Sequence, residues 1–159
     1  TTFSDGYVLD VFTVPDEPGS DSFANESRAE RIRQAVSGAL MGEITLSEEL
    51  TKAPAWRRRS DAFSVPPQVV IDNKASATHT VIEVVGRNRT GFLNKIAWTL
   101  NQQGLRIAQS RIASYGERAV DVFYVKDVFG LKMEQEAKIA AVRKALLQAL
   151  DELAELGGD

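Results

Sequence analysis

The chain has 159 residues, of which 43% are hydrophobic and 26% are charged, a balance typical of a globular protein rather than a disordered one. Its formal net charge of −3 gives no general attraction to phosphate backbones or anionic lipids, so neither nucleic acid nor a membrane is expected as a partner. The absence of cysteine excludes disulfides, thiolate nucleophiles and cysteine-based zinc sites, and the single histidine, His79, leaves no histidine pair for a metal.

The sequence shows no sign of membrane insertion or secretion. No apolar run reaches the roughly 18 residues that a membrane span needs, and no signal peptide is visible. We therefore expect a cytoplasmic protein. The opening TTFSDG has no Met and starts within a structural pattern, so we also expect this chain to be an excised part of a longer one.

Residues 1–53 are predicted to be the C-terminal half of an α/β domain whose first strand and first helix would precede residue 1. The predicted elements are the tail of a strand at residues 1–4, a strand at residues 6–15 and a helix at residues 25–41. Thr45 and Glu48 have capping-box spacing, which predicts a further short helix. Residues 54–66 have a proline at each end and are expected to be a linker.

Residues 67–159 are predicted to form a second, complete domain. The predicted elements are strands at residues 67–73, 78–86, 105–114 and 119–127, and helices at residues 92–104 and about 134–156. From residue 78 onward the order is strand, helix, strand, strand, helix. This order predicts an α+β fold, a ferredoxin-like sandwich in which two helices cover one face of an antiparallel sheet.

The strand at residues 67–73 is needed to complete that sheet. It is joined to the next strand by the short connection KASA, and so short a connection makes an antiparallel hairpin. We therefore predict that residues 69–72 fill the fourth-strand position of the sheet. The alternative is that they close the preceding half-domain.

Both helices of the second domain have an apolar face. The first has a stripe of Leu93, Ile96, Ala97 and Leu100, followed by Gly104 as the expected C-terminal cap. The stripe of the final helix consists of Ile139, Val142, Leu146, Ala149, Leu150 and Leu153. Trp98 lies off the first stripe, so it is either an exposed interface anchor or packs beneath the neighbouring helix.

The two domains repeat each other in sequence. LDVFTVPDEPG at residues 9–19 matches VDVFYVKDVFG at residues 120–130, and AERIRQAVSGAL at residues 29–40 lines up with IAAVRKALLQAL at residues 139–150. This pattern predicts a duplicated domain with one truncated copy. Asp10 and Asp121 recur in it, but an aspartate on a paired strand is more typical of a surface position than of a general base.

The sequence contains no catalytic constellation, and one stretch has the properties of a ligand site. GRNRTGFL, residues 86–93, connects a strand end to a helix start, where unpaired N–H groups and a partial positive charge suit a carboxylate. Gly91 would let a ligand approach the backbone closely, and Asn88 would cap the helix or bind an amino group. The alternative interpretation is a capped turn without a ligand.

The stretch TVIEVVGRNRTGFLNKIAWTLNQQGLRIAQSRIASYGERAVDVFYVKDVFG resembles an ACT domain, a small regulatory module that senses amino acids. Over nearly its whole length, the chain resembles the C-terminal tandem ACT region of the bifunctional PII uridylyltransferase/uridylyl-removing enzymes. That family usually has GRDRPGLL where this chain has GRNRTGFL, so Asn88 replaces an acidic residue, Thr90 a proline and Phe92 a leucine.

The resemblance implies a regulatory role in nitrogen metabolism, with glutamine as the effector. Its nucleotidyltransferase and phosphodiesterase-type hydrolase domains, which use Mg and UTP and act on the PII signalling protein, would lie upstream, and no cofactor is expected in this fragment. The implied ligand-binding residues are Asn88, Arg89, Thr90, Gly91, Phe92 and Leu93, together with Ile107, Ala108 and Gln109 of the next strand, or of a neighbouring copy.

Two other functions were compared with glutamine sensing. A structural module would hold domains or copies together by ACT-to-ACT pairing, without a ligand. RNA binding is suggested by Phe123 and Tyr124, but adjacent strand residues point to opposite faces of a sheet and cannot form one stacking platform.

Overall fold

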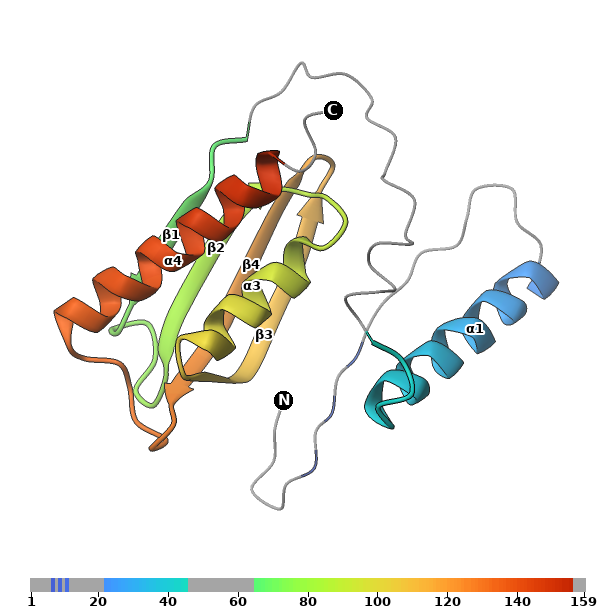
Figure 1. Ribbon diagram of the computed structural model, residues 1–159, viewed down its shortest axis with the longest axis horizontal. Coiled ribbons are helices and arrows are strands. Elements are labelled where there is room, and N and C mark those ends of the chain that lie inside the picture. The colour runs from blue at the N-terminus through green and yellow to red at the C-terminus, as the bar shows by residue number, and fades with distance from the viewer. Residues whose placement is uncertain (1–6, 8, 10, 12–21, 46–64, 156–159) are drawn as a thin grey trace. The chain divides into compact units, whose positions relative to one another are not determined.

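The computed structural model describes residues 7, 9, 11, 22–45 and 65–155 (Figure 1). The chain divides into two compact units: the smaller comprises Asp10–Pro54, and the larger comprises Ala55–Asp159 together with Thr1–Leu9. Each is described by itself. The larger unit contains one four-stranded sheet and two helices, and the smaller one contains a single described helix.

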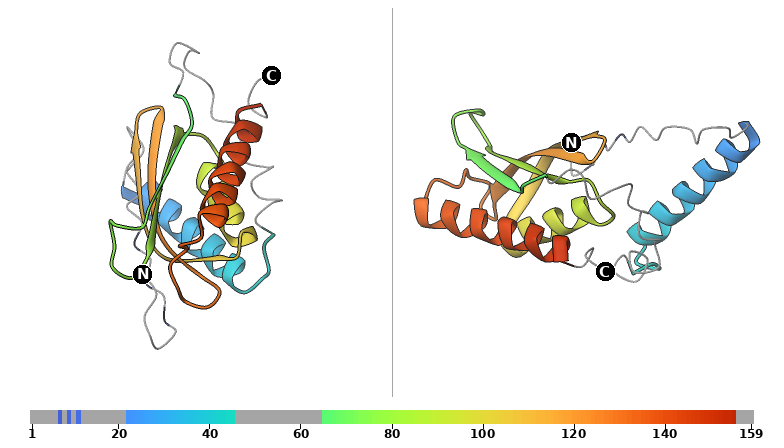
Figure 2. Two further views of the ribbon diagram at one scale, coloured as in Figure 1. Left: turned by 90° about the vertical axis from the view of Figure 1, so that its left-hand side faces the viewer. Right: turned by 90° about the horizontal axis from the view of Figure 1, so that it is seen from above.

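The sheet of the larger unit is antiparallel throughout, with the strand order β1-β2-β4-β3. Its strands are β1 (Gln68–Asp72), β2 (Thr80–Arg87), β3 (Leu105–Tyr115) and β4 (Arg118–Asp127). Two helices, α3 (Phe92–Gln102) and α4 (Glu136–Glu155), cover the same face of this sheet (Figure 2). The predicted ferredoxin-like α+β sandwich is therefore confirmed.

Strand β1 comes first in the sequence of the domain and occupies the position of the fourth strand in the sheet. It pairs antiparallel with β2, and Val70 lies opposite Glu83. The hairpin predicted from the four-residue KASA connection is therefore confirmed, and residues 69–72 complete the sheet of this domain. Val69 and Ile71 face the helices and pack against the core, whereas Val70 is exposed on the open face.

The core lies between the sheet and the two helices. Alternate residues of β4, Ala119, Phe123 and Val125 among them, are buried against the helices. Tyr124 points to the open face, where the guanidinium of Arg111 lies 5.9 Å from the centre of its ring. Phe123 and Tyr124 thus lie on opposite faces, as the alternation predicts.

The buried face of α4 is the one predicted from the sequence, whereas the buried face of α3 is rotated about the helix axis relative to the predicted stripe. On α4, Val142, Leu146, Ala149 and Leu150 are buried, with Ile139 and Leu153 packed at the edges. On α3 the buried residues are Phe92, Ile96, Thr99 and Leu100. Leu93, expected in the stripe, is 37% exposed, so its predicted core position is wrong. The reason is Gly86 on β2: without a side chain there, the Phe92 ring packs directly onto the strand.

A small polar network joins the β1–β2 turn to the start of the segment leading into α4. Thr80 Oγ1 donates to Asn73 Oδ1 over 2.7 Å and accepts from the Met133 N–H over 2.9 Å. Asn73 Nδ2 donates to the Met133 carbonyl over 2.7 Å. Thr80 and Met133 are both buried, so these bonds satisfy polar groups that water cannot reach.

The smaller unit is described by α1 (Ser22–Leu40) and the turn that follows it, so a helix is confirmed close to the predicted residues 25–41. Most of its described side chains are exposed, including Ile32, Val36 and Leu40. Of the predicted strand at residues 6–15, only Tyr7, Leu9 and Val11 are described. The strand tail at 1–4, the capping box of Thr45 and Glu48, and residues 54–64 of the linker lie wholly or partly outside the described residues. The duplication and the domain boundaries remain predictions.

Candidate functional site

The predicted ligand corner is an open helix start. Gly91 precedes α3 with φ 83°, in the left-handed region, and no atom lies within 4 Å of the place where a Cβ would stand. No side chain caps the helix. The N–H of Lys95 is bonded to the Gly91 carbonyl over 2.8 Å. Within the described chain, the amides of Leu93 and Asn94 have no hydrogen-bond acceptor, so they can receive an anion.

The loop before α3 is held in place by its own polar side chains. The Asn88 N–H donates to the Glu117 carbonyl over 2.7 Å, and its side-chain amide donates to the Gly116 carbonyl over 3.3 Å. The Arg87 guanidinium forms an ion pair of 2.9 Å with the Glu117 carboxylate. Arg89 donates to the Leu153 carbonyl of α4 over 2.6 Å. These contacts fix the corner against the β3–β4 turn and the end of α4.

The side chains expected to bind the ligand have different positions in this corner. Asn88 does not cap the helix, as was one expectation, because its amide group is used by the β3–β4 turn. The Phe92 side chain is buried, and its N–H donates to the Arg89 carbonyl over 3.1 Å. Thr90 and Leu93 are exposed beside Gly91. A ligand at this corner would therefore meet mainly backbone amides and the exposed turn.

The three predicted residues of the next strand, Ile107, Ala108 and Gln109, lie at the other end of the sheet. Ile107 pairs with Val125, and Val125 pairs with Thr80 at the start of β2. The corner follows Arg87, seven residues further along β2, which is a separation of about 20 Å. Within one copy these residues cannot bind the same amino acid as the corner. A β-bulge falls between Ile107 and Gln109.

Asp121 is buried, contrary to the surface position expected from the sequence. It lies on the helix-covered face of β4, opposite Val84 and Ile112, with 1% of its surface exposed. Neither carboxylate oxygen has a hydrogen-bond partner in the structure. Burial raises the pKa of Asp121 to about 6, and the Ala113 amide opposes this rise without reaching hydrogen-bond geometry. Strand alternation with Phe123 was the sequence signal for this burial.

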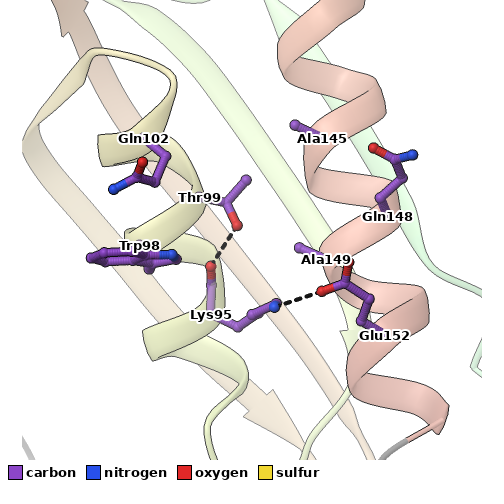
Figure 3. Close-up of a pocket in the computed structure, with 8 residues that line it drawn as sticks. All are labelled: Lys95, Trp98, Thr99, Gln102, Ala145, Gln148, Ala149 and Glu152. Atoms are coloured by element: carbon purple, nitrogen blue, oxygen red, sulfur yellow. Dashed lines mark hydrogen bonds and ion pairs between the residues drawn. The ribbon is translucent and has the colours of Figure 1, made fainter. Parts of the chain in front are cut away.

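A groove lies between α3 and α4 on the outer side of the helix layer and has a volume of about 210 Å³ (Figure 3). Thr99, Ala145 and Ala149 line it with small side chains. Lys95 reaches across to Glu152 with an N–O distance of 2.7 Å. Trp98 lies at the α3 side of the groove and is 59% exposed. Of its two expected positions, exposed or packed beneath the neighbouring helix, the structure shows the exposed one.

Among the described residues, no three acidic or histidine side chains gather into a cluster that could hold a metal ion. No helix in that part of the chain is long and apolar enough to cross a bilayer.

Comparison with known proteins agrees with this geometry. Residues 75–151 match the family model of the ACR family N-terminal ACT domain, so this part of the chain is an ACT domain, with the fold that the sequence resemblance implied. No solved structure matches the chain.

Most of the chain is similar to enzymes named bifunctional uridylyltransferase/uridylyl-removing enzyme. The relative from Azospirillum brasilense is 45% identical over 150 residues, and that from Rhodospirillum rubrum is 44% identical over 151 residues. The match covers 94% of this chain and 16% of each relative. The resemblance seen in the sequence is thus confirmed, and the chain spans about one sixth of the length of these relatives.

Proposed function

We propose that this chain is a regulatory module that senses glutamine for a PII-protein uridylyltransferase/uridylyl-removing enzyme. The observation that carries the proposal is the uncapped start of α3 at Gly91, in a domain whose family and relatives fit a regulatory role. The ligand carboxylate would accept hydrogen bonds from the Leu93 and Asn94 amides, and the partial positive charge of the helix end would favour it.

Sensing would operate by a shift between two arrangements of the enzyme. A ligand shifts such an equilibrium only by its difference in affinity for the two states, and a tenfold shift needs about 1.4 kcal/mol. One or two charge-assisted hydrogen bonds to backbone amides supply a difference of this size, since each is worth roughly 1.5–3 kcal/mol.

The test is isothermal titration of the 159-residue chain with glutamine, with Gly91→Ala as the blocking variant. Its methyl group would occupy the open space beside the amides, so we expect the Kd to rise by about tenfold or more, the loss of roughly one such bond. Gly130→Ala is the matched control, because Gly130 has φ 80° and likewise has no atom within 4 Å of a Cβ. It lies after β4, at the other end of the sheet, and should leave the Kd unchanged.

Glutaminol, which has no carboxylate, should not bind to the wild-type chain. The proposal is wrong if glutamine gives neither heat nor a thermal shift at millimolar concentration. It is also wrong if both glycine variants weaken binding equally, because backbone strain rather than the corner would then account for the loss.

The remaining features of the longer enzymes belong to the same proposal. PII would be the substrate protein of the parent enzyme, and Mg and UTP would be bound by domains outside this chain, in the cytoplasm. We assign no catalytic residue to the chain. Ligand-independent pairing of ACT domains is the second candidate, favoured by β3, an edge strand of 11 residues with one side unpaired in the described structure.

A further inference from the structure

Two basic side chains lie directly opposite each other at one end of the sheet. Arg106, near the start of β3, pairs with Lys126, near the end of β4. Both lie on the open face, because the residues before them, Leu105 and Val125, are buried in the core and successive strand residues alternate between faces. Like charges in directly opposite positions destabilise a sheet. In the described part of the chain, no carboxylate forms an ion pair with either of them.

A third cation extends this positive charge along the open face. The Arg111 guanidinium lies 5.9 Å from the centre of the Tyr124 ring, within the range of a cation–π contact. Tyr124 precedes Lys126 by two residues on β4 and therefore shares its face. The carboxylates of Asp72 and Asp127, at the same end of the sheet, accept hydrogen bonds from backbone N–H groups of their own turns. Among the described residues, these three cations thus have no paired carboxylate, although the whole chain has a net charge of −3.

The turn after β4 holds apolar side chains in solvent next to this positive charge. Phe129 is 84% exposed and Leu131 is 63% exposed. The Asp127 carboxylate accepts hydrogen bonds from the N–H groups of Phe129 over 2.9 Å and of Leu131 over 2.8 Å. The N–H of Asp127 donates to the Leu131 carbonyl over 2.8 Å and closes the turn. Because these bonds already order the turn, a partner can bury the Phe129 ring without the entropic cost of fixing a loop.

We propose that this end of the sheet binds an acidic segment of a partner protein. Carboxylates of the partner lie against Arg106, Arg111 and Lys126, and an apolar side chain of the partner packs on Phe129. Complementary charge supports this occupant, because a carboxylate beside Arg106 and Lys126 offsets the repulsion between them. Single-stranded nucleic acid fits less well, since Arg111 lies over the Tyr124 ring on which a base would have to stack. Anionic membranes are recognised by clusters of roughly four to eight basic residues, more than this surface has.

Fluorescence polarisation of the 159-residue chain with a labelled oligoglutamate peptide that has one central leucine tests the proposal. The wild type should bind the peptide with a Kd below about 1 mM, and more weakly as salt screens the charges. Arg106→Glu should raise the Kd about threefold to tenfold, because it turns an attraction into a repulsion. Arg143→Glu makes the same change of charge at an exposed position of α4 and should leave the Kd unchanged. No binding at millimolar peptide, or equal weakening by both substitutions, would overturn the proposal.

Urea unfolding distinguishes a binding role of Arg106 from a role in stabilising the sheet. A glutamate opposite Lys126 replaces cross-strand repulsion with attraction. Arg106→Glu should therefore raise the urea midpoint of unfolding while it weakens binding of the peptide. A lower midpoint would contradict the unrelieved repulsion from which the proposal is argued.

Phe129→Ser tests the apolar contact, since it keeps the backbone N–H that Asp127 accepts from. The Kd for the leucine-containing peptide should rise about fivefold or more, as expected for an aromatic anchor. Tyr115→Ser removes a ring that is 70% exposed at the other end of β3 and should leave the Kd unchanged. Circular dichroism checks that both variants are folded. An unchanged Kd in Phe129→Ser would refute the proposed surface, as would tighter binding of single-stranded RNA or of phosphatidylserine vesicles than of the peptide.

Discussion

Replacing Asp121 by asparagine tests whether one buried carboxyl makes the stability of the ACT domain depend on pH. Burial raises the pKa of Asp121 from its ordinary 3.8 to about 6. The folded state therefore holds the proton of Asp121 more tightly than the unfolded state does. This difference stabilises the fold fully when the pH is below the ordinary pKa of 3.8, and the stabilisation is lost as the pH rises through about 6. The difference between the two pKa values corresponds to about 3 kcal/mol.

Urea unfolding followed by circular dichroism, between about pH 4 and pH 7.5, measures this contribution. The free energy of unfolding of the wild type should fall by about 2–3 kcal/mol more than that of Asp121→Asn over this range. Because the two proteins are compared by how their free energies of unfolding change with pH, any pH-independent cost of burying the asparagine amide cancels. Asp151→Asn, an exposed carboxyl on α4, is the control for loss of one negative charge and should follow the wild type. If the curves of wild type and Asp121→Asn run parallel, the carboxyl does not titrate as its burial requires.

Two further substitutions test the packing and the polar network. Gly86→Ala would place its Cβ 2.6 Å from the Phe92 ring, so we expect the free energy of unfolding in urea to fall by roughly 1–3 kcal/mol. Adding Phe92→Leu should restore part of this stability, and no loss in Gly86→Ala would show that the ring moves freely. Thr80→Val would leave Asn73 Oδ1 and the Met133 N–H without their hydrogen bonds, which should lower the free energy of unfolding by roughly 1–3 kcal/mol. A stability equal to that of the wild type would mean that water replaces the hydroxyl.

Local patterns were sufficient to predict the sheet and most of its helix packing. The short connection after residues 67–73 favoured a hairpin over closure of the preceding half-domain, and the pairing of β1 with β2 is that hairpin, joined by residues 73–79. The α4 stripe was clear because its apolar residues recur at a single helical phase. On α3, Phe92 and Leu93 are adjacent and both apolar, and the choice between them depends on Gly86, a residue of another element.

The part of the candidate site formed by a single strand-to-helix connection could be predicted from the sequence. The part that depends on which residues of neighbouring strands lie side by side could not. Gly91 and the bare amides follow from a strand-to-helix turn and were predicted correctly. Ile107, Ala108 and Gln109 were expected to meet the ligand within one copy or from a neighbouring copy. Because β3 begins at the far end of the sheet, contact from a neighbouring copy is the alternative that stays a prediction. The separation within one copy follows from the order of the elements, because α3 runs back along the sheet before β3 starts. Burial of Asp121 needed the alternation of β4 to outweigh the usual preference of aspartate for water.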